Sequence, residues 1–169
     1  ILSEHIIKLL PQMKDPVVVA ADLGFAKKGR NFAAKINAPI AFIEKRRSGD
    51  DDRAAALTII GDVADRDVIV IDDEVDTAGS VSEAVKKVKL NGARDVYMIF
   101  VHAVLSDPAV TRLSELPLKQ IITTDTIPIP PEKRARLQDR LTVLSVAPLL
   151  AEVILRAHEG RSVGELFDE

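Results

Sequence analysis

The stretch that decides the fold is Val68-Ile69-Val70-Ile71-Asp72-Asp73-Glu74-Val75-Asp76-Thr77-Ala78-Gly79-Ser80. Its first four residues are β-branched and apolar, which predicts a strand over 68–71 that is buried on both faces. Two adjacent carboxylates, Asp72 and Asp73, follow that strand at the carboxyl edge, where open α/β sheets bind their ligands. Small residues then lead into the apolar spacing of a helix over 80–90. The stretch therefore predicts a strand, a ligand-binding turn and a helix in direct succession.

The rest of the chain alternates in the same way. Short apolar runs predict further strands at 17–20, 40–43, 96–101, 121–123 and 141–144, and periodic segments predict helices at 26–36 and 148–160. Strands that alternate with helices are typical of βαβ units. We expect an α/β fold of three layers, a mostly parallel sheet flanked by helices, formed as a single domain by residues 1–169. A mobile loop is expected at 48–56, around Asp50-Asp51-Asp52.

Composition excludes several classes of protein. The 169 residues carry a net charge of −3, which argues against a general nucleic-acid binder. The absence of cysteine excludes disulfides and thiolate metal sites, and it fits a cytoplasmic protein. No apolar run approaches the roughly 18 residues of a membrane span, so we expect no membrane partner. The chain begins at Ile1 rather than at Met, which we interpret as the start of a fragment of a longer protein.

The turn after the 68–71 strand has the chemistry of a sugar-phosphate site. Backbone N–H groups at a helix N-terminus attract anions, and Thr77 and Ser80 add hydroxyl donors. Asp72 and Asp73 can accept hydrogen bonds from sugar hydroxyls. The simpler alternative is a turn whose acids only cap the helix. The glycine patterns of P-loop and dinucleotide-binding proteins do not occur in the chain.

This stretch resembles the 5-phosphoribosyl diphosphate (PRPP) motif of type I phosphoribosyltransferases. The whole chain is similar to the C-terminal half of the ribose-phosphate diphosphokinase family, the PRPP synthetases. Four more landmarks of that family follow one another in the expected order: Asp22-Leu23-Gly24-Phe25-Ala26-Lys27-Lys28, Glu44-Lys45-Arg46-Arg47, His102-Ala103-Val104-Leu105-Ser106 and Ser145-Val146-Ala147-Pro148-Leu149-Leu150-Ala151-Glu152. The resemblance implies a type I phosphoribosyltransferase-like fold.

The resemblance also implies a reaction and its residues. The family transfers diphosphate from ATP to ribose 5-phosphate, giving PRPP and AMP, with Mg²⁺ as cofactor. Asp72 and Asp73 would hold the ribose hydroxyls, directly or through Mg²⁺, and Asp22 would bind Mg²⁺. Lys45 and Arg47 would be catalytic, because they stabilise charge on the transferring phosphoryl group. The 5-phosphate would be wrapped by Asp76, Thr77, Ala78, Gly79 and Ser80.

For the longer parent protein the resemblance implies a homo-oligomer, a dimer or a hexamer. The missing half supplies most adenine contacts in the family, so we expect the isolated chain to bind ribose 5-phosphate with little or no turnover. Two alternatives stay open. A base phosphoribosyltransferase would consume PRPP, but the chain has no spare segment for a hood over the base. A non-catalytic regulatory homologue is slightly favoured by Phe25 and by Asp50-Asp51-Asp52, which depart from the family pattern.

Overall fold

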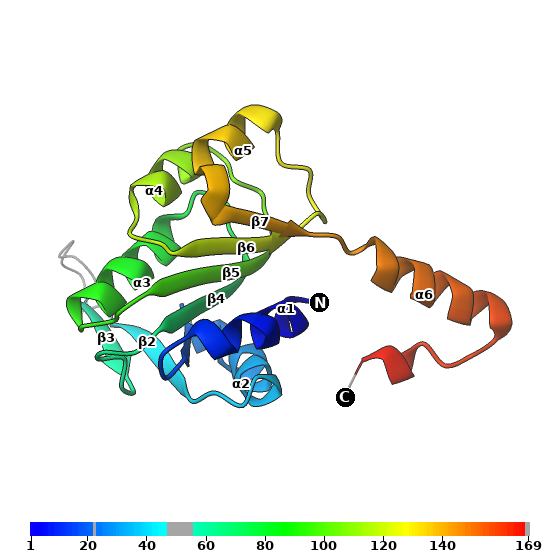
Figure 1. The fold of residues 1–169 in the computed structure, drawn as a ribbon, viewed down its shortest axis with the longest axis horizontal. Helices are drawn as coiled ribbons and strands as arrows, with labels where there is room; N and C mark the ends of the chain where they lie inside the picture. Colours follow the sequence, from blue (N-terminus) through cyan, green and yellow to red (C-terminus); the bar gives the residue numbers. More distant parts are fainter. Residues whose placement is uncertain (22, 47–55, 168–169) are drawn as a thin grey trace.

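The computed structural model describes residues 1–21, 23–46 and 56–167, and it contains a seven-stranded sheet with helices on both faces (Figure 1). The strands are β1 (Val17–Ala20), β2 (Ile40–Arg46), β3 (Ala56–Ile60), β4 (Val68–Glu74), β5 (Val96–His102), β6 (Gln120–Thr124) and β7 (Leu141–Leu144). The α-helices are α1 (Leu2–Leu9), α2 (Ala26–Lys35), α3 (Gly79–Leu90), α4 (Ala109–Glu115), α5 (Pro131–Leu137) and α6 (Ala147–Glu159).

The order of the strands creates a crevice in the middle of the sheet. The order is β3-β2-β1-β4-β5-β6-β7, and every neighbouring pair is parallel except β2 with β3. The chain runs outward from β1 to β2 and β3, then returns to the other side of β1 to form β4. Ligands of open α/β sheets bind where the strand order reverses in this way, outside the carboxyl ends of the two strands. The sheet therefore places its candidate site at the ends of β1 and β4.

Two apolar layers hold the sheet between its helices. On one face, Val68 and Val70 of β4 pack in the cluster that contains apolar side chains of α3 and α4. On the other face, Ile69 and Ile71 pack in the cluster that contains Ile6 of α1 and side chains of α2. Full burial of such a side chain contributes about 1.5–3 kcal/mol. The central position of β4 explains why its four apolar residues occur without alternation, and the predicted three-layer α/β fold is confirmed.

One boundary of the sequence-based prediction was wrong. The strand expected over 68–71 does not end before Asp72 but continues to Glu74, where Asp72 pairs with Phe100 and Glu74 pairs with His102. The residues after Ile71 are less buried, although β4 remains paired with β5 as far as Glu74. Apolar patterning detects burial, whereas strand pairing needs only the backbone. The two site carboxylates Asp72 and Asp73 are therefore held within a strand.

Several short elements carried too little periodicity to be predicted. These are α1, α4 and α5, with seven or eight residues each, and β3, which pairs antiparallel with β2 at the edge of the sheet. The expected mobile loop overlaps β3 at Ala56, and its residues 48–55 lie outside the described part of the chain. The other predicted strands and helices are present, with ends that agree within a few residues.

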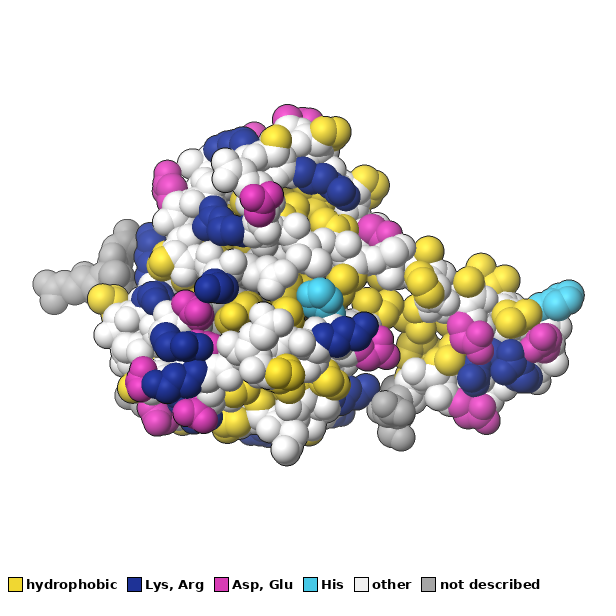
Figure 2. Space-filling model, viewed as in Figure 1, with side chains coloured by type: hydrophobic (Ala, Val, Ile, Leu, Met, Phe, Trp, Pro, Cys, Tyr) yellow, Lys and Arg dark blue, Asp and Glu magenta, His cyan; other side chains and the backbone are white. Residues whose placement is uncertain are grey.

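The last long helix, α6, projects away from the sheet (Figure 1). None of its residues is buried, and the side chains of Leu150, Ile154 and Leu155 are 45–69% exposed. Figure 2 shows apolar side chains along this projection. Among the helices that the structure describes, none has the length and apolar character needed to cross a bilayer.

Candidate functional site

The segment between β4 and α3 is anchored at its start and turns sharply at its end. The N–H of Val75 donates to the carbonyl of His102 at 3.0 Å, and the carbonyl of Val75 accepts from the N–H of Leu105 at 2.9 Å. Ala78 then takes a left-handed conformation, with φ of 59° and ψ of 21°, and α3 begins at Gly79. An L-residue adopts this conformation only at a cost of about 1–2 kcal/mol. The surrounding contacts therefore impose the shape of the turn.

This turn encloses a hollow of about 310 Å³, lined by residues 72–81. Asp72, Asp73, Asp76, Thr77, Ala78, Gly79 and Ser80 are the residues predicted to bind the sugar phosphate, and all of them line it. Within the described chain, none of the backbone N–H groups of residues 76–80 donates to a protein partner. Unpaired N–H groups at the N-terminus of a helix favour an anion. The hollow thus combines anion donors with carboxylate acceptors.

The two carboxylates on β4 have different surroundings. Asp73 accepts a hydrogen bond from the Lys28 ammonium at 3.4 Å, and its own N–H donates to Asp72 Oδ1 at 2.9 Å. Partial burial alone would raise the pKa of Asp73, but the hydrogen bond and charge of Lys28 hold that pKa below its usual value. Asp73 is therefore ionised at neutral pH. Both partners of this ion pair are more than half exposed, so it contributes little to stability and a ligand can displace Lys28.

The predicted metal and catalytic residues lie mostly outside the described chain. Asp22 and Arg47 are not among the described residues, and of Lys45 the structure describes only the backbone, which pairs with Leu57 in β3. The topology nevertheless places the segments that carry them together. Strands β2, β1 and β4 are adjacent and parallel, so their carboxyl ends meet at one edge of the sheet.

The described residues at this edge fit a Mg²⁺ ion that is held jointly by protein carboxylates and substrate phosphates. Among residues 1–21, 23–46 and 56–167, no three His, Cys, Asp or Glu side chains form a group that could hold a metal. Mg²⁺ is usually held by one or two carboxylates together with substrate phosphates. Asp72 and Asp73, beside a hollow with the chemistry of a phosphate site, match that second arrangement.

Sequence reasoning missed two cations that approach the turn. Lys28 lies on α2 and reaches Asp73, as described above. Arg112 lies on α4, and its Nη1 donates to the carbonyl of Thr77 at 2.8 Å. Both contacts join residues far apart in the chain, and α4 itself was not predicted. No local pattern in the sequence identifies either contact.

Comparisons with known proteins identify a matching family and similar proteins. Residues 51–168 match the model of the phosphoribosyl synthetase-associated domain. The chain is 48% identical over 153 residues to the ribose-phosphate pyrophosphokinase of Caldanaerobacter subterraneus, covering 90% of this chain and 47% of that protein. It is 41% identical over 169 residues to the enzyme of the same name from Clostridium acetobutylicum, covering all of this chain and 52% of the relative. The chain thus spans about half the length of the curated relatives it matches.

Solved structures show similarity to the same kind of protein as the sequence comparisons do. The phosphoribosylpyrophosphate synthetase of Mycobacterium smegmatis superposes with a TM-score of 0.84 at 38% identity, over 94% of this chain and 50% of that one. The orotate phosphoribosyltransferase of Aeropyrum pernix superposes with a TM-score of 0.52 at 16% identity, over 90% of this chain and 76% of that one. The second likeness shows the shared type I phosphoribosyltransferase-like fold alone. On the match over residues 51–168 and the identities to its relatives, this chain belongs to the phosphoribosyl synthetase-associated domain family.

Proposed function

We propose that the protein of which this chain forms part is a ribose-phosphate diphosphokinase. In this reaction the anomeric hydroxyl oxygen of ribose 5-phosphate attacks the β-phosphorus of ATP and its proton is released to solvent, while the bond from that phosphorus to the oxygen bridging the α- and β-phosphates breaks and AMP leaves. The products are PRPP and AMP. The observation that carries the proposal is the hollow of residues 72–81, where backbone N–H groups without a described protein partner and the carboxyl groups of Asp72 and Asp73 face a single ligand-sized space.

Each part of the hollow has a role in this proposal. The N–H groups of residues 76–80 and the hydroxyls of Thr77 and Ser80 bind the 5-phosphate. Asp72 and Asp73 lie on the strand just before the loop and accept hydrogen bonds from the ribose hydroxyls. Holding the sugar at both ends fixes the direction of its anomeric hydroxyl, and correct orientation supplies a large part of the rate of such reactions.

The charge on the transferring group requires cations. Mg²⁺, held by Asp22 and shared with Asp72 and Asp73, would neutralise charge on the phosphates when it is bound. Lys45 lies near the end of β2 and Arg47 comes two positions later in the sequence, and both complete this neutralisation at the transferred phosphoryl group. The adjacency of β1, β2 and β4 supports these assignments, because it brings the three segments to one edge. A dimeric or hexameric assembly and a cytoplasmic location are proposed on the same resemblance.

Calorimetry on the 169-residue chain tests the binding half of the proposal. We expect ribose 5-phosphate to bind with Mg²⁺ present and ribose to bind far more weakly, because ribose has no phosphate for the loop. Binding of ribose as strong as that of ribose 5-phosphate would contradict the role of the loop. An AMP-release assay tests the other half. We expect little or no turnover by this chain and full turnover by the whole protein, since the resemblance assigns most adenine contacts to the other half of the family's chain.

A further inference from the structure

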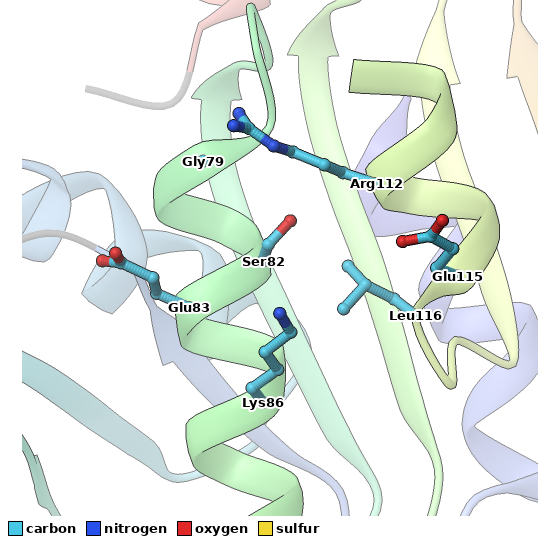
Figure 3. A pocket seen from close by; sticks show the side chains of 7 residues that line it. All are labelled: Gly79, Ser82, Glu83, Lys86, Arg112, Glu115 and Leu116. Carbon is cyan, nitrogen blue, oxygen red and sulfur yellow. The ribbon is translucent and has the colours of Figure 1, made fainter. Parts of the chain in front are cut away.

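Arg112 contacts residues 76–80, which form the proposed phosphate loop, and it lines a different hollow from the one lined by residues 72–81. Its side chain crosses from α4 to the first turn of α3 and ends beside Gly79 (Figure 3). A second hollow of about 250 Å³ lies between these helices, and Arg112, Lys86 and Glu115 line it. The ligand hollow is lined by residues 72–81 and by no residue of α4. Gly79 borders both spaces, so the loop forms the wall between them.

The hydrogen bond from Arg112 fixes the direction of one peptide group. Nη1 of Arg112 donates to the carbonyl of Thr77 at 2.8 Å. In a trans peptide the carbonyl and the following N–H point in opposite directions. Holding the Thr77 carbonyl toward α4 therefore turns the N–H of Ala78 away from α4, toward the ligand side of the loop.

The next peptide group is held from within α3. The carbonyl of Ala78 accepts from the N–H of Ser82 at 3.1 Å and from the Ser82 hydroxyl at 2.5 Å. Because Ala78 is in the unfavourable left-handed region, the loop needs such anchors to keep this shape. Arg112 holds the first of the two carbonyls and Ser82 holds the second.

Gly79 leaves room for the guanidinium. A Cβ at position 79 would lie 3.6 Å from Nη1 of Arg112 and 3.8 Å from Oγ1 of Thr77. The backbone of Gly79 does not have a positive φ, so its conformation does not require glycine. A branched side chain at this position would extend toward Arg112. A methyl group at position 79 would therefore fit beside Arg112, and only a larger side chain would compete with the guanidinium for this space.

We propose that Arg112 is a positioning residue for the phosphate loop, which orients the peptide between Thr77 and Ala78 so that the Ala78 N–H faces the 5-phosphate. The identity of the ligand rests on the proposed function, whereas the orientation of the peptide does not. Arg112 acts through the loop, so its loss weakens binding of the phosphate group in particular.

Three variants separate positioning from charge. Arg112→Met removes the donor and keeps most of the side-chain length. Arg112→Lys keeps the charge and one possible donor. Lys86→Met removes a positive charge from the same hollow; its ammonium makes no hydrogen bond to the loop among the described residues. The assays are calorimetry of the 169-residue chain with ribose 5-phosphate and amide hydrogen exchange at Ser82, whose N–H donates to the Ala78 carbonyl, with thermal melting to confirm folding.

We expect Arg112→Met to weaken ribose 5-phosphate binding about tenfold, as loss of one hydrogen bond from a charged group implies. We expect Arg112→Lys to recover part of this loss and Lys86→Met to bind as the unaltered chain does. Exchange of the Ser82 N–H, which donates to the Ala78 carbonyl, should become faster in Arg112→Met alone, because that carbonyl is then less firmly held. An unchanged affinity in Arg112→Met, or an equal loss in Lys86→Met, would overturn the proposal.

The experiments distinguish an error in the proposed function from an error in the role proposed for Arg112. If the unaltered chain does not bind ribose 5-phosphate, the proposed function is wrong, and exchange of the Ser82 N–H still decides the role of Arg112. Faster exchange in Arg112→Met with unchanged exchange in Lys86→Met would then support positioning. Equal exchange in all variants would refute it.

Discussion

Asp67→Asn tests a buried carboxylate at the edge of the sheet opposite the phosphate loop. Asp67 lies immediately before β4 and is fully buried. Its Oδ1 accepts from Arg94 Nε at 2.7 Å and from the N–H of Asp95 at 3.2 Å. Its Oδ2 accepts from Arg94 Nη2 at 2.5 Å and from the N–H of Lys14 at 2.8 Å. One side chain thus ties together the segments before β1, β4 and β5.

The hydrogen bonds that Asp67 accepts determine how much stability Asp67→Asn should lose. An asparagine amide in either orientation directs its NH₂ at two of these donors, and one of the two is always a backbone N–H. An unpaired buried N–H costs about 1–3 kcal/mol. The lost bond to Arg94 adds less, because that side chain is 41% exposed and water can replace the partner. We expect Asp67→Asn to lower the free energy of unfolding by about 2–3 kcal/mol at pH 7.

The loss of stability in Asp67→Asn should depend on pH, and the pKa of Asp67 gives the direction of that dependence. Burial alone would raise the pKa of Asp67, but hydrogen bonds from Arg94 and from the N–H groups of Lys14 and Asp95 hold that pKa below its usual value. A carboxyl whose pKa is lower in the folded state stabilises the protein above its unfolded pKa of about 4, and loses that effect as the pH falls through the folded pKa. The asparagine variant lacks this titration. The difference in stability between the two proteins should therefore shrink from pH 7 toward pH 3.

Urea unfolding of both proteins across this pH range is the assay. Asp65→Asn is the matched control, because Asp65 is 78% exposed and its partner is the exposed ammonium of Lys14; its unfolding midpoint should not change. Affinity for ribose 5-phosphate should also be unchanged in Asp67→Asn under conditions where it is folded. A loss below about 1 kcal/mol at pH 7, or a difference that grows on acidification, would refute the reasoning.

Three further changes address the candidate site. Asp72→Asn should leave the melting temperature nearly unchanged or raise it, because the amide oxygen can still accept from the N–H of Asp73 and one of two adjacent charges is removed; calorimetry with and without Mg²⁺ should show weaker Mg²⁺-dependent binding of ribose 5-phosphate. Gly79→Ala should bind nearly as the unaltered chain does, since its Cβ would make ordinary contacts, whereas Gly79→Val should weaken binding at least as much as Arg112→Met does, by displacing Arg112; binding by the valine variant as strong as that of the unaltered chain would contradict this. Lys45→Met in the whole protein should lower AMP release about 10²-fold or more while ribose 5-phosphate still binds, and an unchanged rate would exclude Lys45 from catalysis.

The sequence predicted the fold class and most of the sheet because the relevant signal is local. Val68 to Ile71 are apolar without alternation, which required a central strand covered on both faces, and β4 has that position. The turn from Asp76 to Ser80 was also predictable from the local sequence, because small residues directly precede a segment with helical periodicity. The residues of this turn are close in sequence, so one local stretch supplies the lining of a single hollow.

Short elements and long-range contacts could not be predicted in this way. Helix α4 has seven residues, too few for a reliable period, and therefore Arg112 could not be placed beside Thr77, 35 positions away. The contact of Lys28 with Asp73 spans 45 positions and exists because β1 and β4 are neighbours. The amino-acid sequence by itself determined which residues form the loop between β4 and α3. Only the tertiary structure decided which cations approach it, since strand order and helix packing bring together groups that no local pattern connects.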